Sequence, residues 1–181
     1  MAFIRTKSIK GQNYAYLVRN MWTARGPRQE STAYLGKVIL GDRKEAKTLA
    51  ELVGVSNINE YIEKTDFKDA IIKLVLLELH NHQADKYEFD AENTRLFNKK
   101  NKKEVVLGIN DGFLCSHTIR ELLNYDAGGD ETGFKLASLI TAAGIRVEKD
   151  AFVGIFGKLR AQAKDVEIEE KKKTVTGEFY Y

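Results

Sequence analysis

Four side chains of the sequence are types that bind soft metal ions, and they occur as two pairs, His80 with His82 and Cys115 with His117. Together they could form a tetrahedral zinc site. Residues two apart on a helix point about 200° away from each other, so neither pair chelates a metal within a helix. Cys115 and His117 also lack the orienting third group that would make them a nucleophile and its base. We therefore predict no metal site and expect Cys115 to be a small buried apolar residue.

A second candidate for chemistry is the stretch 154–158, in which Gly154 and Gly157 precede Lys158. A Walker A loop needs a longer glycine spacing and a Ser or Thr after the lysine, where this chain has Leu159. The Gly-x-x-Gly clamp of K-homology domains has polar or basic middle positions, whereas those of this chain are Ile and Phe. We expect these glycines to allow close packing against the preceding helix.

No acidic residues have the spacing of a catalytic pair, so we predict no catalytic residue and no cofactor. An enzyme whose pocket the sequence does not reveal is an alternative that stays open. With 181 residues, 43% of them hydrophobic, the chain has enough apolar content for a folded core. Its longest apolar run, 71–77, contains Lys73 and cannot span a bilayer. With no signal-peptide pattern and a single cysteine, we expect a cytoplasmic protein without membrane contact.

The charge is distributed unevenly along the chain. Residues 1–47 hold ten of the 29 Lys and Arg residues but only three of the 26 Asp and Glu residues. The front of the chain is therefore basic by seven charges, while the rest is acidic by four. This layout is typical of a small module that binds a polyanion and is attached to another unit. A merely solvated basic surface is the alternative.

The basic front has the pattern of β-strands. Apolar and polar residues alternate, or nearly alternate, in residues 3–9, 14–22 and 28–39. Turn-like segments at 10–13 and 24–27 separate these stretches, and the pattern predicts a three-stranded antiparallel meander. In its middle strand Tyr14, Tyr16 and Val18 share one face and the alternate residues share the other, of which one should be the core. The aromatic residues Tyr14, Tyr16, Trp22 and Tyr34 either stack on bases or only pack across strands. The predicted nucleic-acid contacts are Arg5, Lys7, Lys10, Arg19, Arg25, Arg28, Lys37, Tyr16 and Trp22.

The same segment resembles a known family. The strings Ile4–Lys7, Tyr14–Val18, Pro27–Gln29 and Tyr34–Val38 resemble the extreme N-terminus of certain insertion-sequence transposases of the DDE type. In that family the stretch precedes the catalytic domain, and the resemblance implies DNA contact by Arg5, Lys7, Arg19, Arg28 and Lys37. The remaining chain is too short for the ribonuclease-H-like catalytic domain, so no transposase activity follows. The whole chain is also similar to uncharacterised archaeal proteins, which implies no function.

The remainder predicts a mainly helical body, residues 41–164, and a charged, aromatic tail, residues 165–181. Helical spacing covers 43–53, a short segment from 56, a broadly apolar and central segment from Phe67 to Leu79 that runs to about 82, then 113–124, 131–143 and 151–163. A β-hairpin is expected near 95–109. The fold class is therefore α+β: a small N-terminal sheet of three antiparallel strands, a helical body and one hairpin. The turn of that hairpin would offer secondary phosphate contacts from Lys99, Lys100, Lys102 and Lys103.

These features predict a non-catalytic protein that binds nucleic acid, duplex DNA in preference to RNA, through the basic N-terminal sheet. Two alternatives stay open. The apolar helix 67–79 or the tail could dock on a protein partner or a second copy of the chain. Alternatively, the same sheet could serve an RNA-binding or ribosome-associated factor.

Overall fold

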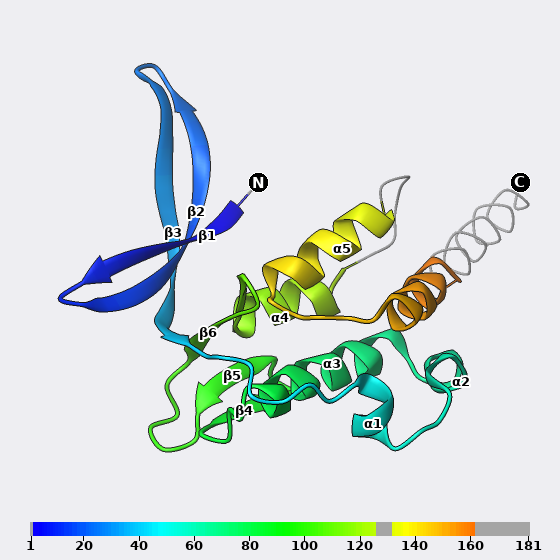
Figure 1. Ribbon diagram of the computed structural model, residues 1–181. Coiled ribbons are helices and arrows are strands. Elements are labelled where there is room, and N and C mark those ends of the chain that lie inside the picture. Colours follow the sequence, from blue (N-terminus) through cyan, green and yellow to red (C-terminus); the bar gives the residue numbers. More distant parts are fainter. Residues whose placement is uncertain (1, 126–131, 162–181) are drawn as a thin grey trace, which may run out of the picture.

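The computed structural model describes residues 2–125 and 132–161 (Figure 1). The predicted tail, residues 165–181, lies outside the described residues. The strands are β1 (Ala2–Ile9), β2 (Gln12–Thr23), β3 (Gly26–Leu40), β4 (Tyr87–Asp90), β5 (Arg95–Asn98), β6 (Val105–Ile109) and β7 (Gly112–Leu114). The helices are α1 (Leu49–Val53), α2 (Ile58–Lys64), α3 (Phe67–Asn81), α4 (Ser116–Leu123) and α5 (Thr132–Ala142), and residues 149–161 are helical as well.

The chain has an α+β fold, as predicted, and the first three strands pair as an antiparallel meander. The prediction of a three-stranded sheet was wrong, because the sheet has five strands in the order β1-β2-β3-β6-β7. β3 is 15 residues long, and its last residues, Lys37–Leu40, also pair in parallel with Val105–Gly108 of β6. This pairing buries Val105, Val106 and Leu107.

The hairpin expected near 95–109 was also wrong in its pairing. β5 pairs with β4, and β6 pairs with β3 and β7. Between β5 and the start of β6 the structure has one isolated antiparallel β-bridge, from Phe97 to Glu104. The lysine-rich turn does form, because the Asn98 N–H donates to the Lys103 carbonyl at 2.9 Å. After this turn the chain leaves β5, since the apolar residues of β6 would be half exposed in a two-stranded hairpin and are buried in the large sheet.

The segment 113–124 is not one helix, as predicted, but β7 followed by α4. Asn110 and Asp111 both have positive φ, 45° and 66°, which makes the two-residue turn that joins β6 to β7. Cys115 then stands at the N-cap of α4. The helix expected over 43–53 begins only at Leu49, because the Thr48 hydroxyl accepts from the Glu51 N–H and the Glu51 carboxylate accepts from the Thr48 N–H.

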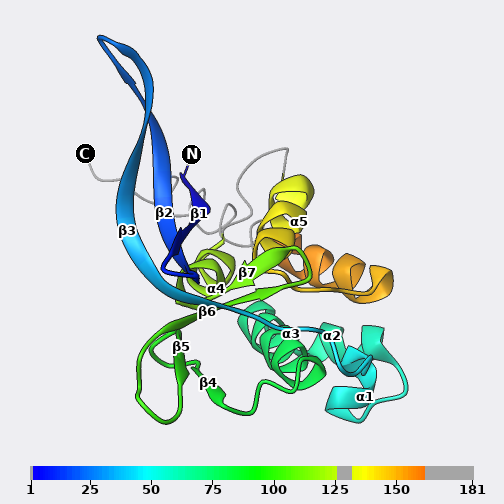
Figure 2. The same ribbon diagram turned by 60° about the vertical axis from the view of Figure 1, so that its left-hand side comes forward.

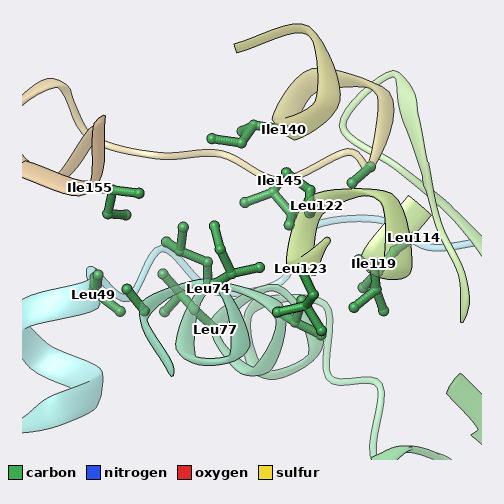
Figure 3. Packing of buried hydrophobic residues seen from close by; sticks show 14 of the residues in the cluster. Leu49, Leu74, Leu77, Leu114, Ile119, Leu122, Leu123, Ile140, Ile145 and Ile155 are labelled. Carbon is green, nitrogen blue, oxygen red and sulfur yellow. The ribbon is translucent and has the colours of Figure 1, made fainter. Parts of the chain in front are cut away.

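The main core surrounds α3, which is central, as its broad apolar surface predicted. Ile71, Leu74 and Val75 are at most 1% exposed. Figure 3 shows side chains of α1, α4, α5 and the helical segment 149–161 lying around Leu74 and Leu77. The apolar face of α3 is thus covered by the chain itself, and it is not a free surface for a partner.

One carboxylate is fully buried inside this body. Glu78 of α3 is 0% exposed; its carboxylate accepts from the Asn110 side-chain amide at 2.9 Å and from the Arg146 N–H at 2.8 Å. The Arg43 guanidinium lies 3.5 Å from the same carboxylate. Buried charges persist in proteins when they are paired and hydrogen-bonded in this way. Glu78 therefore ties α3 to the β6–β7 turn and to the segment after α5.

The first three strands project from the body as an extended ribbon (Figures 1 and 2). We call residues 2–40 the ribbon. Its base is held by a second, small cluster of buried residues: Ala15, Val38, Val106 and Cys115, with Ile4, Leu35 and Phe113 packed against it. The ribbon is therefore anchored to β6 and β7 at one end, and its other end extends away from the helices.

Candidate nucleic-acid interface

The strand register brings three cations and three tyrosines to one face of the ribbon. Directly opposed residues on paired strands share a face. β1 opposes Arg5 to Tyr16 and Lys7 to Tyr14, while β3 opposes Tyr34 to Tyr16 and Lys37 to Tyr14. We call this set the tyrosine face: Arg5, Lys7, Tyr14, Tyr16, Tyr34 and Lys37.

The side chains of the tyrosine face contact one another. The ring centroids of Tyr16 and Tyr34 are 5.4 Å apart and tilted by 57°, and Tyr14 lies 6.3 Å from Tyr34. The Lys7 Nζ sits 4.9 Å from the centre of the Tyr16 ring, a distance at which a cation is attracted to the ring. These contacts order the long lysine side chain, so part of its conformational entropy is already lost before any ligand binds.

Within residues 2–125 and 132–161, the cations of the tyrosine face have no acidic partner. Arg5, Lys7 and Lys37 are exposed, and none of the ion pairs among the described residues includes them. Arg5 instead donates from Nη1 to the side-chain oxygen of Gln29 on β3. Gln29 was not predicted as a site residue, since only the register of β2 with β3 places it there. The face therefore carries three positive charges that are free to meet phosphate.

Tyr34 adds a neutral hydrogen-bond donor to this face. It is 59% exposed, whereas Tyr14 and Tyr16 are half-buried. Partial burial, followed by the neighbouring Tyr14 and Tyr16 hydroxyls, raises the pKa of Tyr34. The Tyr34 hydroxyl therefore keeps its proton over the physiological range and can donate to an anion.

The other predicted cations of the front lie elsewhere. Arg19 and Arg28 are opposed to Glu30 and Met21, and the strand alternation puts both on the face opposite to the tyrosines. Arg19 is also ion-paired with Glu30 at 2.8 Å. Lys10 and Arg25 lie in the two turns of the ribbon. The nine predicted contact residues thus form no single cluster, and four of them, Arg5, Lys7, Tyr16 and Lys37, lie together on the tyrosine face.

The ribbon continues past β1 as two strands only. β1 ends its pairing where Ala2 opposes Arg19, while β2 and β3 stay paired from Asn20 with Gln29 to Thr23 with Gly26. We call residues 20–29 the arm; it is the end of the ribbon that stands away from the body in both views (Figures 1 and 2). Trp22, a predicted contact residue, is on the arm and is 84% exposed.

The predicted secondary contacts, Lys99, Lys100, Lys102 and Lys103, lie in the turn between β5 and β6. This turn is at the other end of the molecule from the arm (Figures 1 and 2), but its last lysine lies two residues before Val105, which is opposed to Lys37 of the tyrosine face. The Lys102 Nζ lies 4.8 Å from the Phe97 ring and 3.9 Å from the Glu88 carboxylate, so this lysine is engaged locally.

Three of the four soft metal-ligand side chains, His80, His82 and Cys115, are engaged in packing or hydrogen bonds. The His80 Nε2 is 2.8 Å from the Glu45 carboxylate, and the His82 Nδ1 is 2.9 Å from the Glu78 carbonyl oxygen. Cys115 is buried, as expected, and burial raises the pKa of its thiol. Among the described residues, no three His, Cys, Asp or Glu side chains are grouped closely enough to hold a metal ion.

The stretch 154–158 packs against the body and has its lysine occupied. A Cβ on Gly154 would meet the Ile62 side chain at 3.1 Å, so glycine allows close approach to α2 rather than to the preceding helix. The Lys158 Nζ donates to the Ile62 carbonyl at 3.1 Å and also to the Glu63 carbonyl. Such a lysine satisfies carbonyls at the end of α2 and is not directed toward a phosphate.

A cavity of about 120 Å³ lies beside α3 and the start of α1. Its polar lining comes from Arg43, Lys47, Thr48, Arg146 and Glu148, with no His or Cys. The arrangement contains neither the nucleophile with its base nor the pair of carboxylates that group transfer or hydrolysis needs. This cavity therefore assigns no reaction.

In comparisons with known proteins, no family model, curated protein or solved structure matches the chain. Within the described part of the chain, no helix has both the length and the apolar composition to cross a membrane.

Proposed function

We propose that this protein binds duplex DNA without catalysis, through the tyrosine face of its ribbon. The observation that carries the proposal is the presence of Arg5, Lys7 and Lys37 on one exposed face, where none of them has an acidic partner among the described residues. Lys and Arg contacts to phosphate supply most of the affinity of sequence-independent DNA binding. Residues 41–164 hold 19 basic and 20 acidic residues, so the body has almost no net charge and attracts a polyanion less than the ribbon does.

The packing of the rings favours duplex over single-stranded nucleic acid. Unspecific binding of single strands uses open aromatic faces on which successive bases stack. Here Lys7 lies over the Tyr16 ring, and Tyr34 contacts both Tyr14 and Tyr16. The Tyr16 ring is thus occupied by Lys7, and the groups that the face presents to a ligand are positive charge and the Tyr34 hydroxyl, which suit a phosphate backbone.

Two further points support DNA as the duplex. The N-terminal segment resembles the region that precedes the catalytic domain in DDE-type insertion-sequence transposases, where DNA contact is expected. β-ribbons also enter the grooves of B-DNA, whose minor groove can be deformed by apolar side chains, whereas the major groove of RNA duplexes is narrow and deep.

Fluorescence anisotropy with a labelled DNA duplex of about 20 base pairs tests the proposal. We expect binding at low salt that weakens steeply between about 50 and 200 mM salt, because phosphate contacts release counterions. Unlabelled duplex DNA should compete better than single-stranded DNA or double-stranded RNA of the same length. No binding at the lower salt, an affinity independent of salt, or stronger competition by RNA or by the single strand would overturn the proposal.

A further inference from the structure

The end of the arm carries an exposed apolar pair. Trp22 and Pro27 are directly opposed across β2 and β3, next to the turn formed by Ala24 and Arg25. Trp22 is 84% exposed, the highest fraction among the exposed large hydrophobic residues of the described chain. Neither core cluster of the described residues reaches this far along the ribbon, so the core does not cover the ring.

The backbone under this pair is held firmly. The turn is two residues long, and Gly26 takes a φ of 98° that other residues rarely adopt. The Thr23 hydroxyl donates to the Gly26 carbonyl at 2.8 Å and accepts from the Arg25 N–H at 3.3 Å. Pro27 has a fixed φ. The arm therefore presents its apolar end in one defined orientation.

Positive charge surrounds the same end. Arg25 is in the turn, and Arg28 follows Pro27. Glu30 is the one acidic residue between positions 19 and 30, and it is paired with Arg19 at the base of the arm. Arg25 and Arg28 take part in none of the ion pairs among the described residues. A polyanion is the partner that this charge pattern fits.

We propose that the arm enters the minor groove of duplex DNA, where Trp22 and Pro27 wedge into one base step and bend the duplex. The inference rests on the proposed function, since the tyrosine face would hold the phosphate backbone while the arm reaches further along the duplex. The four residue pairs beyond β1 extend about 14 Å at roughly 3.4 Å per residue, which exceeds the groove depth of about 7.5 Å. Apolar side chains that wedge between base steps unstack them and widen the narrow minor groove.

The single tryptophan of the chain makes the test direct, because all tryptophan emission comes from Trp22. A DNA duplex with a donor and an acceptor dye at its two ends reports bending by energy transfer. When the wild-type protein binds, we expect energy transfer to rise and Trp22 to become protected from quenching by acrylamide. Trp22→Ala should still bind, with the same dependence on salt, but should leave energy transfer near that of free DNA. Trp22→Phe, the matched control, should retain most of the bend because it keeps an aromatic wedge.

The outcomes separate the wedge from the proposed function. Wild-type protein that binds the duplex without changing energy transfer, or with Trp22 still accessible to acrylamide, would overturn the wedge and leave DNA binding intact. Bending that is undiminished in Trp22→Ala would also overturn it. Absence of binding would remove both proposals. Protection of Trp22 that rises with protein concentration in the absence of DNA would show that the arm docks on a second copy of the chain, and would overturn the wedge.

Discussion

Replacing the three cations of the tyrosine face together should flatten the salt dependence of duplex binding. The substitutions are Arg5→Ala, Lys7→Ala and Lys37→Ala, at exposed side chains that join no ion pair among the described residues. Each phosphate contact contributes about 0.9 to the slope of log affinity against log salt, so three contacts contribute about 2.7. Between about 50 and 200 mM salt, the wild-type affinity should therefore fall roughly 40-fold more than that of the variant.

The matched control removes the same amount of charge from the helical body, by Lys68→Ala, Lys73→Ala and Lys149→Ala. Lys68 and Lys73 are on α3 and Lys149 is in the helical segment 149–161, and neither helix belongs to the sheet that holds the tyrosine face, so the control should keep the wild-type slope. Anisotropy titrations of one labelled duplex at four or more salt concentrations give the slopes, and circular dichroism verifies that both variants are folded. Equal slopes for the wild type and the tyrosine-face variant would refute the assignment, as would an equal loss of slope in the control.

Three further predictions concern the framework that carries the ribbon. Glu78→Ala should lower the free energy of unfolding by about 3–5 kcal/mol, because the Arg43 guanidinium loses its ion-pair partner and the Arg146 N–H and the Asn110 side-chain amide lose their acceptor. Unfolding by urea measures this loss, and a loss below about 1 kcal/mol contradicts the prediction. Gly36→Ala should lower the free energy of unfolding by roughly 1–3 kcal/mol in the same assay, because Gly36 has a φ of 137° and a Cβ there would lie 3.2 Å from the Glu104 carbonyl oxygen. An unchanged urea midpoint would contradict this prediction. Burial raises the pKa of the Cys115 thiol, so above about pH 8.5 this thiol ionises in the unfolded chain but not in the folded one, and the free energy of unfolding falls as pH rises. Cys115→Ala should remove this fall, and identical plots of unfolding free energy against pH for the wild type and the variant would contradict the prediction.

The strands of the ribbon were predictable because the alternation of side chains is a local property of the sequence. Residues 3–9, 14–22 and 28–39 match β1, β2 and β3 closely. The partner of β3 was not predictable in the same way. Its parallel pairing with β6 joins Lys37 to Val105, and nothing local in either strand distinguishes that pairing from a hairpin between β5 and β6.

The error at 113–124 has a local signal that was present in the sequence. Asn110 and Asp111 tolerate the left-handed conformation, and together they form a hairpin turn. The apolar residues after them, Phe113 and Leu114, fit either a short strand or the first turn of a helix. Pairing with β6 favours the strand, because Leu114 is then fully buried.

The candidate site was predictable in its members but only partly in its grouping. Strand alternation alone places Arg19 on the face away from Tyr14 and Tyr16. The ion pair between Arg19 and Glu30, and the position of Gln29 beside Arg5, follow from the register of β2 with β3, which two irregularities shift. That register depends on the tertiary structure, and the sequence pattern does not determine it.

Mapping the bound duplex residue by residue tests the central proposal most directly. In a titration of isotope-labelled protein with duplex DNA, followed by amide and side-chain NMR signals, we predict that the largest shifts occur at Arg5, Lys7, Tyr16, Tyr34 and Lys37. Signals of α3 should stay in place. Shifts concentrated on the helices, with the tyrosine face unchanged, would contradict the proposal.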